Sequence, residues 1–193
     1  MECIRKIQIE DTIYTANTDF RTAIKCNEIA MDNSIGDFER TLAIICTIFG
    51  EKGLDNPEHY EKLINWIKNF LSCGKEIDNS KEEPDMDYVE DMDYIITSFQ
   101  SDYGINLDEQ SMDWQKFNNL INGLSNSEMG NCCILNRVRN LRRTDVSKIK
   151  DRKEREEIIK AKKSVELKRY KKENNLTKEQ EKSREELYKS LGL

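Results

Sequence analysis

The residue types best suited to metal binding or nucleophilic catalysis are spread thinly along this sequence. Six cysteines occur, at positions 3, 26, 46, 73, 132 and 133, without any Cys-x-x-Cys pair, and the single histidine is His59. Zinc sites and thiol oxidoreductases use closely spaced cysteine pairs, in zinc sites often with histidine. The sequence therefore predicts reduced thiols, with Cys26 and Cys46 as small core residues. We expect His59 to be a solvated side chain in the turn that opens a helix.

One cluster of carboxylates, formed by Asp85, Asp87, Glu90, Asp91 and Asp93, has the chemistry to bind a cation. It lacks the glycine turn and the terminal bidentate glutamate of a calcium loop. The sequence also has no phosphate-binding glycine loop, no nucleophile elbow and no His-Glu-x-x-His motif. We interpret the cluster as a solvated helix face beside a linker. The protein is expected not to be an enzyme, and to have no catalytic residue, no cofactor and no metal.

Charge is distributed unevenly along the 193 residues, of which 35% are charged, and the formal net charge of −6 conceals two opposite parts. Residues 1–136 hold 11 basic and 26 acidic side chains, whereas residues 137–173 hold 16 basic and 7 acidic side chains. This pattern predicts an acidic body that carries a basic arm. The arm suits an acidic protein surface, including that of another copy of the chain. Nucleic acid is the weaker alternative, because the acidic body would repel a polyanion.

The elements that position these side chains are predicted to be helices, because only 8 glycines and 2 prolines interrupt the chain. So few turn residues disfavour a sandwich, a barrel or a doubly wound sheet and predict a mainly α fold made of helical bundles. Residues 3–16 are the exception, since two runs rich in Ile, Thr and Tyr around Glu10 and Asp11 predict a small β-hairpin. Apolar residues at helical spacing predict helices near residues 19–31, 34–50, 57–74, 88–99, 112–124 and 134–141.

These patterns divide the chain into four segments. Residues 1–74 are expected to form the hairpin and three helices, residues 75–87 an acidic linker, residues 88–144 a second helical unit, and residues 145–193 a long charged, net-basic helical arm. No apolar run is long enough to span a membrane, and the N-terminus lacks the apolar stretch of a signal peptide. We therefore expect a cytoplasmic protein without membrane contacts.

Three segments together resemble a family from tailed bacteriophages and prophages of Gram-positive bacteria that is named for gene product fifteen. They are TIYTANTDFRTAIK at residues 12–25, DYIITSFQSDYGINLDEQSMDWQKFNNLINGLS at residues 93–125, and NRVRNLRRTDVSKIKDRKEREEIIKAKK at residues 136–163. Their order and spacing match over most of the chain. Asp113 stands where the family more often has histidine, and Gln115 stands where it often has a second aromatic residue.

The resemblance implies a role in phage tail morphogenesis, because members of this family are typically encoded among tail genes. It implies a tail assembly chaperone, made in the cytoplasm of the bacterial host, that binds the tape-measure protein and other tail proteins before the tail tube polymerises. A structural tail component is one alternative. A nucleic-acid-binding protein that uses the basic arm at residues 137–172 is another.

The residues expected to contact a partner are Trp114, Phe117, Arg137, Arg139, Arg142 and Arg143. The two aromatic residues can do so only if they are exposed. The competing interpretation places these aromatic side chains in the core and the arginines on a solvated helix face.

Overall fold

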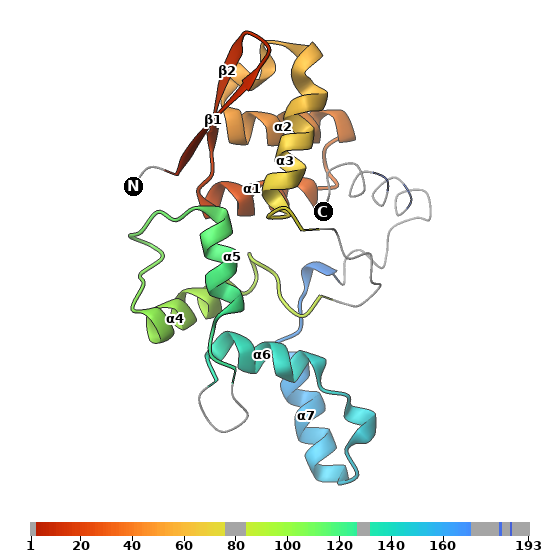
Figure 1. The fold of residues 1–193 in the computed structure, drawn as a ribbon. Helices are drawn as coiled ribbons and strands as arrows, with labels where there is room; N and C mark the ends of the chain where they lie inside the picture. The colour runs from red at the N-terminus through yellow and green to blue at the C-terminus, as the bar shows by residue number, and fades with distance from the viewer. Residues whose placement is uncertain (1–2, 76–83, 127–131, 171–181, 183–185, 187–193) are drawn as a thin grey trace. The chain divides into compact units, whose positions relative to one another are not determined.

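The computed structural model describes residues 3–75, 84–126 and 132–170, together with residues 182 and 186. Within these residues the fold is mainly α-helical with one small antiparallel hairpin, as the sequence predicted (Figure 1). The elements in chain order are β1 (Ile4–Ile9), β2 (Thr12–Asn17), α1 (Phe20–Ala30), α2 (Asp37–Phe49), η1 (Glu51–Leu54), η2 (Pro57–His59), α3 (Tyr60–Leu71), α4 (Met92–Tyr103), α5 (Trp114–Asn122), α6 (Ile134–Arg143), η3 (Val146–Lys148) and α7 (Arg152–Ser164). The three η elements are short 3-10 helices.

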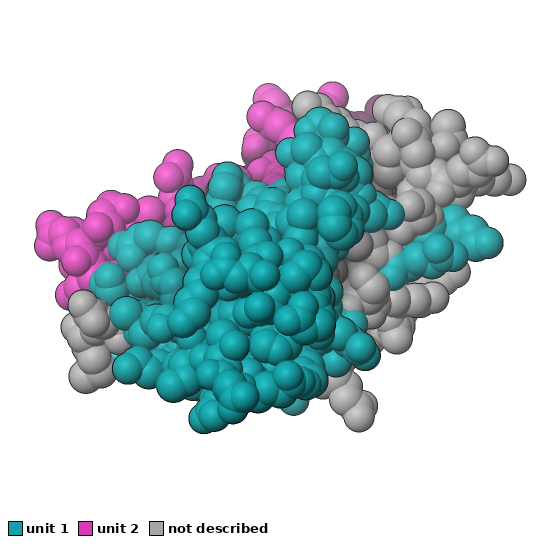
Figure 2. All heavy atoms as spheres, turned by 90° about the horizontal axis from the view of Figure 1, so that it is seen from above, with its two compact units in different colours: residues 1–80, 111–119, 177–193 teal, residues 81–110, 120–176 magenta. Residues whose placement is uncertain are grey.

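The chain divides into two compact units, coloured separately in Figure 2. Unit 1 comprises residues 1–80, 111–119 and 177–193, and unit 2 comprises residues 81–110 and 120–176. The division departs from the segments expected from sequence at residues 111–119, which pack with the N-terminal half of the chain. Residues 76–83 of the expected linker, and the expected arm beyond residue 170 apart from residues 182 and 186, lie outside the described residues.

The hairpin pairs β1 with β2 from Ile9↔Thr12 to Ile4↔Asn17 and turns at Glu10 and Asp11. Glu10 adopts a left-handed φ of 54°, and its carbonyl oxygen accepts a hydrogen bond of 2.9 Å from the Gln8 side chain. Alternate residues of β2 are buried and exposed, as expected for a strand with one face on a core. The hairpin therefore forms a cover on the remainder of unit 1.

The central helix of the N-terminal half is α2, which contacts α1, β2, η1 and α3. Its buried side chains are Arg40, Ile44, Ile45, Ile48 and Phe49. Gly50, with φ of 68°, ends the helix. A Cβ atom at Gly53 would lie only 2.9 Å from Ile45 Cγ2 and Phe49 Cβ, so glycine is what allows η1 to lie this close to α2. Phe38 stands at the helical spacing of the apolar residues of α2, but it is 66% exposed in the first turn.

The prediction of a solvated His59 was wrong, because its side chain is buried. Its Nδ1 atom lies 2.8 Å from the hydroxyl oxygen of Tyr14, which also accepts a hydrogen bond of 3.1 Å from the Asn56 side chain. Since that oxygen already accepts from Asn56, the Tyr14 proton is available to His59 Nδ1. His59 Nε2 lies 3.5 Å from a Glu10 oxygen, and Lys62 binds the other oxygen of Glu10 at 2.6 Å. This network ties the hairpin to η2 and α3.

Unit 2 is built on α4 and α6, which are in contact. Its buried apolar side chains in these two helices are Ile95, Phe99, Leu135 and Val138. The hydroxyl of Ser98 accepts a hydrogen bond of 3.1 Å from the Leu135 N–H at the start of α6. By contrast, α7 contains no buried residue and is held by polar contacts such as Lys162 Nζ to the Thr144 carbonyl at 2.6 Å. The basic arm is therefore helical over Arg152–Ser164, with little apolar anchorage.

Replacing Tyr14 with phenylalanine should lower the free energy of unfolding by about 1–2 kcal/mol, because His59 and Asn56 both lose a buried hydrogen-bond partner. Urea titration monitored by circular dichroism measures the change. The control is Tyr94→Phe, since the Tyr94 hydroxyl has no hydrogen-bond partner among the described residues, and it should shift stability by less than about 0.5 kcal/mol. Equal changes in the two variants would contradict the assignment.

Candidate interaction surfaces

The two aromatic candidates for partner contact, Trp114 and Phe117, are core residues of unit 1, with exposures of 2% and 0%. The indole N–H of Trp114 donates a buried hydrogen bond of 3.0 Å to the Leu71 carbonyl at the end of α3. The Phe117 ring stacks on the Phe20 ring of α1 at 4.5 Å. Neither side chain presents a surface to a partner in this structure, so the competing interpretation from the sequence holds for both.

Backbone pairing explains why these aromatic residues belong to unit 1. The Phe20 N–H donates to the Met112 carbonyl and the Trp114 N–H donates to the Thr18 carbonyl, both at 2.9 Å. The carboxylate of Asp19, which caps α1, accepts a further hydrogen bond of 3.2 Å from the Met112 N–H. The chain that enters α5 is thereby fixed against the chain that enters α1.

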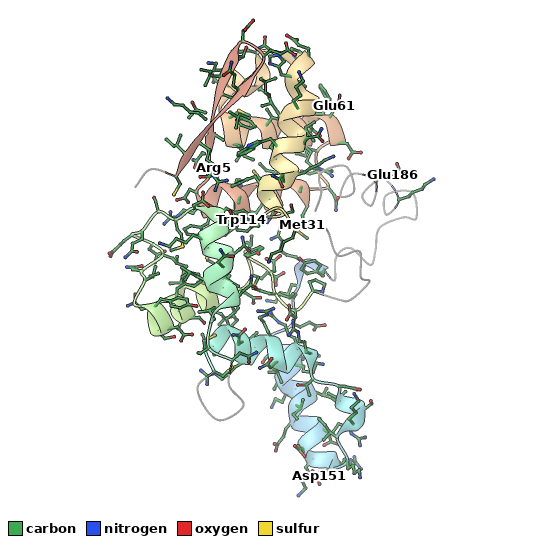
Figure 3. The ribbon with its side chains drawn as sticks, viewed as in Figure 1. Arg5, Met31, Glu61, Trp114, Asp151 and Glu186 are labelled. Atoms are coloured by element: carbon green, nitrogen blue, oxygen red, sulfur yellow. The ribbon has the colours of Figure 1, made fainter. Side chains whose placement is uncertain are left out.

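Asp113 has a defined structural role at the start of α5. Its carboxylate accepts a hydrogen bond of 3.0 Å from the Gln115 N–H and forms an ion pair of 3.1 Å with Arg5 of β1. Arg5 and Gln115 also line a pocket of about 250 Å³ whose aromatic wall is the stacked pair Trp66 and Phe70 of α3. Figure 3 labels Arg5 and Trp114 among the side chains of this unit.

Among the arginine candidates, Arg142 is the one most enclosed by protein. Two of its nitrogens bind the two carboxylate oxygens of Asp91 at 2.6 and 2.7 Å. The side chain of Asp91 is 1% exposed and that of Arg142 is 11% exposed. Arg142 also donates to the carbonyl oxygens of Asp85 at 2.9 Å and Val165 at 2.6 Å. Four hydrogen bonds therefore satisfy a guanidinium group that has left solvent.

Arg139 and Arg143 meet at one carboxylate oxygen, Oδ2 of Asp85. Arg139 Nε lies 3.0 Å from it and Arg143 Nη2 lies 2.6 Å from it. The Arg143 side chain is 59% exposed, so this ion pair sits at the surface of unit 2. Arg137, by contrast, is exposed and forms no ion pair with any described residue.

The chain that follows α7 returns to the same carboxylates. Arg169 forms an ion pair of 3.2 Å with the buried Asp87. The Glu90 carboxylate accepts hydrogen bonds from the backbone N–H groups of Lys168, at 2.8 Å, and Arg169. A carboxylate placed on N–H groups at the start of a helical turn is the favourable arrangement for an anion. Residues 165–170 are therefore fastened to the acidic segment.

The acidic cluster is consequently not the solvated helix face that the sequence predicted. Four of its five members bind basic residues or N–H groups of the C-terminal part of unit 2; they are Asp85, Asp87, Glu90 and Asp91. Only Asp93 remains exposed without an ion pair among the described residues. The opposite charges of residues 1–136 and 137–173 were visible in the sequence. The basic residues were expected to bind an acidic surface of a partner, because the sequence does not show which charges meet.

A comparison with known protein families gives one match. The sequence model of the family described as Bacteriophage Gp15 protein matches residues 2–167 of the 193. The chain belongs to this family. No curated protein and no solved structure matches the chain. The match to the Gp15 family includes every helix and strand described above and confirms the resemblance seen in the three sequence segments.

All six cysteines of this Gp15-family chain lie in described residues and are free thiols. Burial raises the pKa of the Cys26 thiol to about 12, so this thiol is protonated at neutral pH. In the described ranges no group of three or more His, Cys, Asp or Glu side chains is placed to hold a metal ion. None of the described helices combines the length and the apolar character of a membrane span.

Replacing Arg142 with alanine should destabilise the protein by about 3–5 kcal/mol, because the Asp91 carboxylate would stay buried without its partner. The matched control is Arg152→Ala, which removes an ion pair to Glu156 whose two side chains are exposed and should cost less than about 1 kcal/mol. Denaturant titration of both variants measures the difference. A small effect of Arg142→Ala would show that the buried pair does not hold unit 2 together.

Proposed function

We propose that this Gp15-family protein is a tail assembly chaperone that binds the tape-measure protein before the tail tube polymerises. The observation that carries the proposal is the family match over residues 2–167. In this proposal the protein acts in the cytoplasm of the bacterial host. It works by covering surfaces and not by catalysis.

Exposed apolar side chains of unit 1 support a covering role. Phe38 is 66% exposed, and Leu42, one helical turn further along α2, is half-buried on the same side of the helix. On the outer face of the hairpin, Ile4 and Ile13 are each about half exposed. Exposed apolar patches commonly mark interaction sites, and apolar side chains of a helix at this spacing are what a second helix packs against. Several weakly bound copies along one extended partner would gain strength by avidity.

The two alternatives predict different behaviour. A structural tail component would persist in purified mature tails, where mass spectrometry would detect it. A nucleic-acid-binding protein would use the basic residues of the arm, but four arginines of unit 2 already bind carboxylates; they are Arg139, Arg142, Arg143 and Arg169. This internal neutralisation removes four of the 16 basic side chains of residues 137–173 from the charge that would release counterions from a duplex.

Co-expression with the tape-measure protein of the same phage tests the proposal directly. We expect the tape-measure protein to be insoluble when expressed alone, and to become soluble and co-purify when this chain is present. If it stays insoluble in both cases, or becomes soluble without co-purifying, the chaperone proposal fails.

Replacing Phe38 with serine should reduce the co-purified tape-measure protein by roughly fivefold to tenfold, because an apolar side chain exposed in the free protein would no longer be buried in the complex. The matched control is Ile159→Ser, which removes a 47% exposed apolar side chain from α7 among charged neighbours. Both variants should keep the unfolding midpoint of the native chain. Equal losses in the two variants would exclude α2 as the contact.

A further inference from the structure

Two guanidinium groups on α6 converge on one point at the surface of unit 2. Arg139 and Arg143 are one helical turn apart, and both bind the same oxygen of the Asp85 carboxylate, at 3.0 and 2.6 Å. Arginine binds carboxylates with planar, charge-assisted hydrogen bonds. The pair is therefore a built site for a single carboxylate, and Asp85 fills it.

The side chain and the backbone of Asp85 are bound by different arginines. Its carboxylate binds Arg139 and Arg143, whereas its carbonyl oxygen accepts a hydrogen bond of 2.9 Å from Arg142, which also forms the buried ion pair with Asp91. The Arg143 side chain is 59% exposed, whereas those of Arg139 and Asp85 are 21% and 18% exposed, so solvent reaches the site from the side of Arg143. Because the turn is held through the Asp85 carbonyl, another carboxylate can replace the Asp85 side chain without unfolding the turn.

We propose that Asp85 is an internal placeholder, and that the Arg139–Arg143 pair binds a carboxylate presented by an acidic segment of a partner protein. The occupant seen in the structure defines the partner segment. Asp85 has the uncharged neighbours Pro84 and Met86, with Glu83 and Asp87 two residues away, so the fitting segment is an acidic stretch in which the bound Asp or Glu has an uncharged residue on each side. This inference goes beyond the chaperone proposal and does not depend on it.

The charges around the site favour a protein segment over nucleic acid. Three further carboxylates of the same acidic segment remain in unit 2 when Asp85 moves away: Asp87 bound to Arg169, Glu90 to the Lys168 N–H and Asp91 to Arg142. Duplex DNA carries one negative charge for about every 1.7 Å of its axis, so it would bring further phosphates against these three carboxylates. A protein segment can direct one carboxylate to the arginine pair and turn its other charged side chains away from these carboxylates.

Asp85 also determines when the Arg139–Arg143 pair can bind a partner. A tethered carboxylate acts at an effective concentration in the millimolar range, so a free acidic segment at a lower concentration competes poorly. A partner must either supply additional contacts or bind a form of the protein in which Asp85 is displaced. Removing the charge of Asp85 should therefore increase binding from outside.

The experiment measures binding of a dye-labelled, end-capped peptide with the sequence of residues 84–89, PDMDYV, by fluorescence anisotropy at low salt. The Asp85→Asn variant should bind it about tenfold more tightly than the native chain, as expected for release of one charge-assisted contact. The matched control is Asp93→Asn, which makes the same change in net charge at an exposed aspartate that forms no ion pair with a described residue and should bind like the native chain. Urea titration confirms that both variants are folded.

Two further arms identify the site and the kind of partner. Adding Arg143→Gln to the Asp85→Asn variant should abolish the gain, and the peptide whose first aspartate is replaced by asparagine should show no gain. In the native chain, Arg143→Gln alone should weaken binding of the peptide, and its exposed position keeps that variant folded. The proposal is overturned by an equal gain in Asp93→Asn, by no gain in Asp85→Asn, or by a gain for a DNA duplex without a gain for the peptide.

Discussion

The Arg142 guanidinium joins three parts of unit 2 that are far apart in the sequence. It binds the Asp91 carboxylate with two hydrogen bonds, the Asp85 carbonyl with a third and the Val165 carbonyl with a fourth. Removing an ion pair from water costs several kcal/mol per ion unless its hydrogen bonds are fully replaced. The four acceptor atoms replace these hydrogen bonds only when the segments around Asp85, Asp91 and Val165 lie together around Arg142. The contacts of Asp85, Asp87 and Glu90 with the C-terminal part of unit 2 depend on the same arrangement.

Periodicity was sufficient to predict the local elements, because the hairpin and the helices of both units bury residues at regular spacing. Which side chains meet across long separations could not be predicted in the same way. Arg142 and Asp91 lie 51 positions apart, and Tyr14 and His59 lie 45 apart. A charged or polar residue has the same sequence signal whether its partner is solvent, another protein or its own chain. His59 and the acidic cluster were misjudged for that reason.

The candidate contact residues also show what helical spacing predicts and what it does not. Helical spacing alone left Trp114 and Phe117 open between core and contact surface, and contacts with Leu71 and Phe20 decided for the core. Phe38 continues the apolar spacing of α2, but it is 66% exposed, whereas Arg40 in the same turn is buried. Periodicity gives the direction of a side chain around a helix and not the extent of what covers it.

The exposed surfaces of the two units respond differently to solution conditions. Apolar contact through Phe38 and its neighbours is strengthened by salts that are excluded from protein surfaces. Contact through Arg139 and Arg143 is weakened as mobile ions screen it. Under the two proposals, salts of the excluded kind would strengthen binding of a partner at α2, and added salt would weaken binding of a partner at the arginine pair.

Residues 111–119 belong to unit 1, although 30 residues of unit 2 precede them in the chain. A ribosome adds about 5–20 residues each second. Trp114 and Phe117, which pack in the core of unit 1, are therefore synthesised several seconds after the first three helices. During that interval Phe20 and the end of α3 lack their final neighbours. The nascent N-terminal half therefore lacks these contacts until residues 111–119 have been translated.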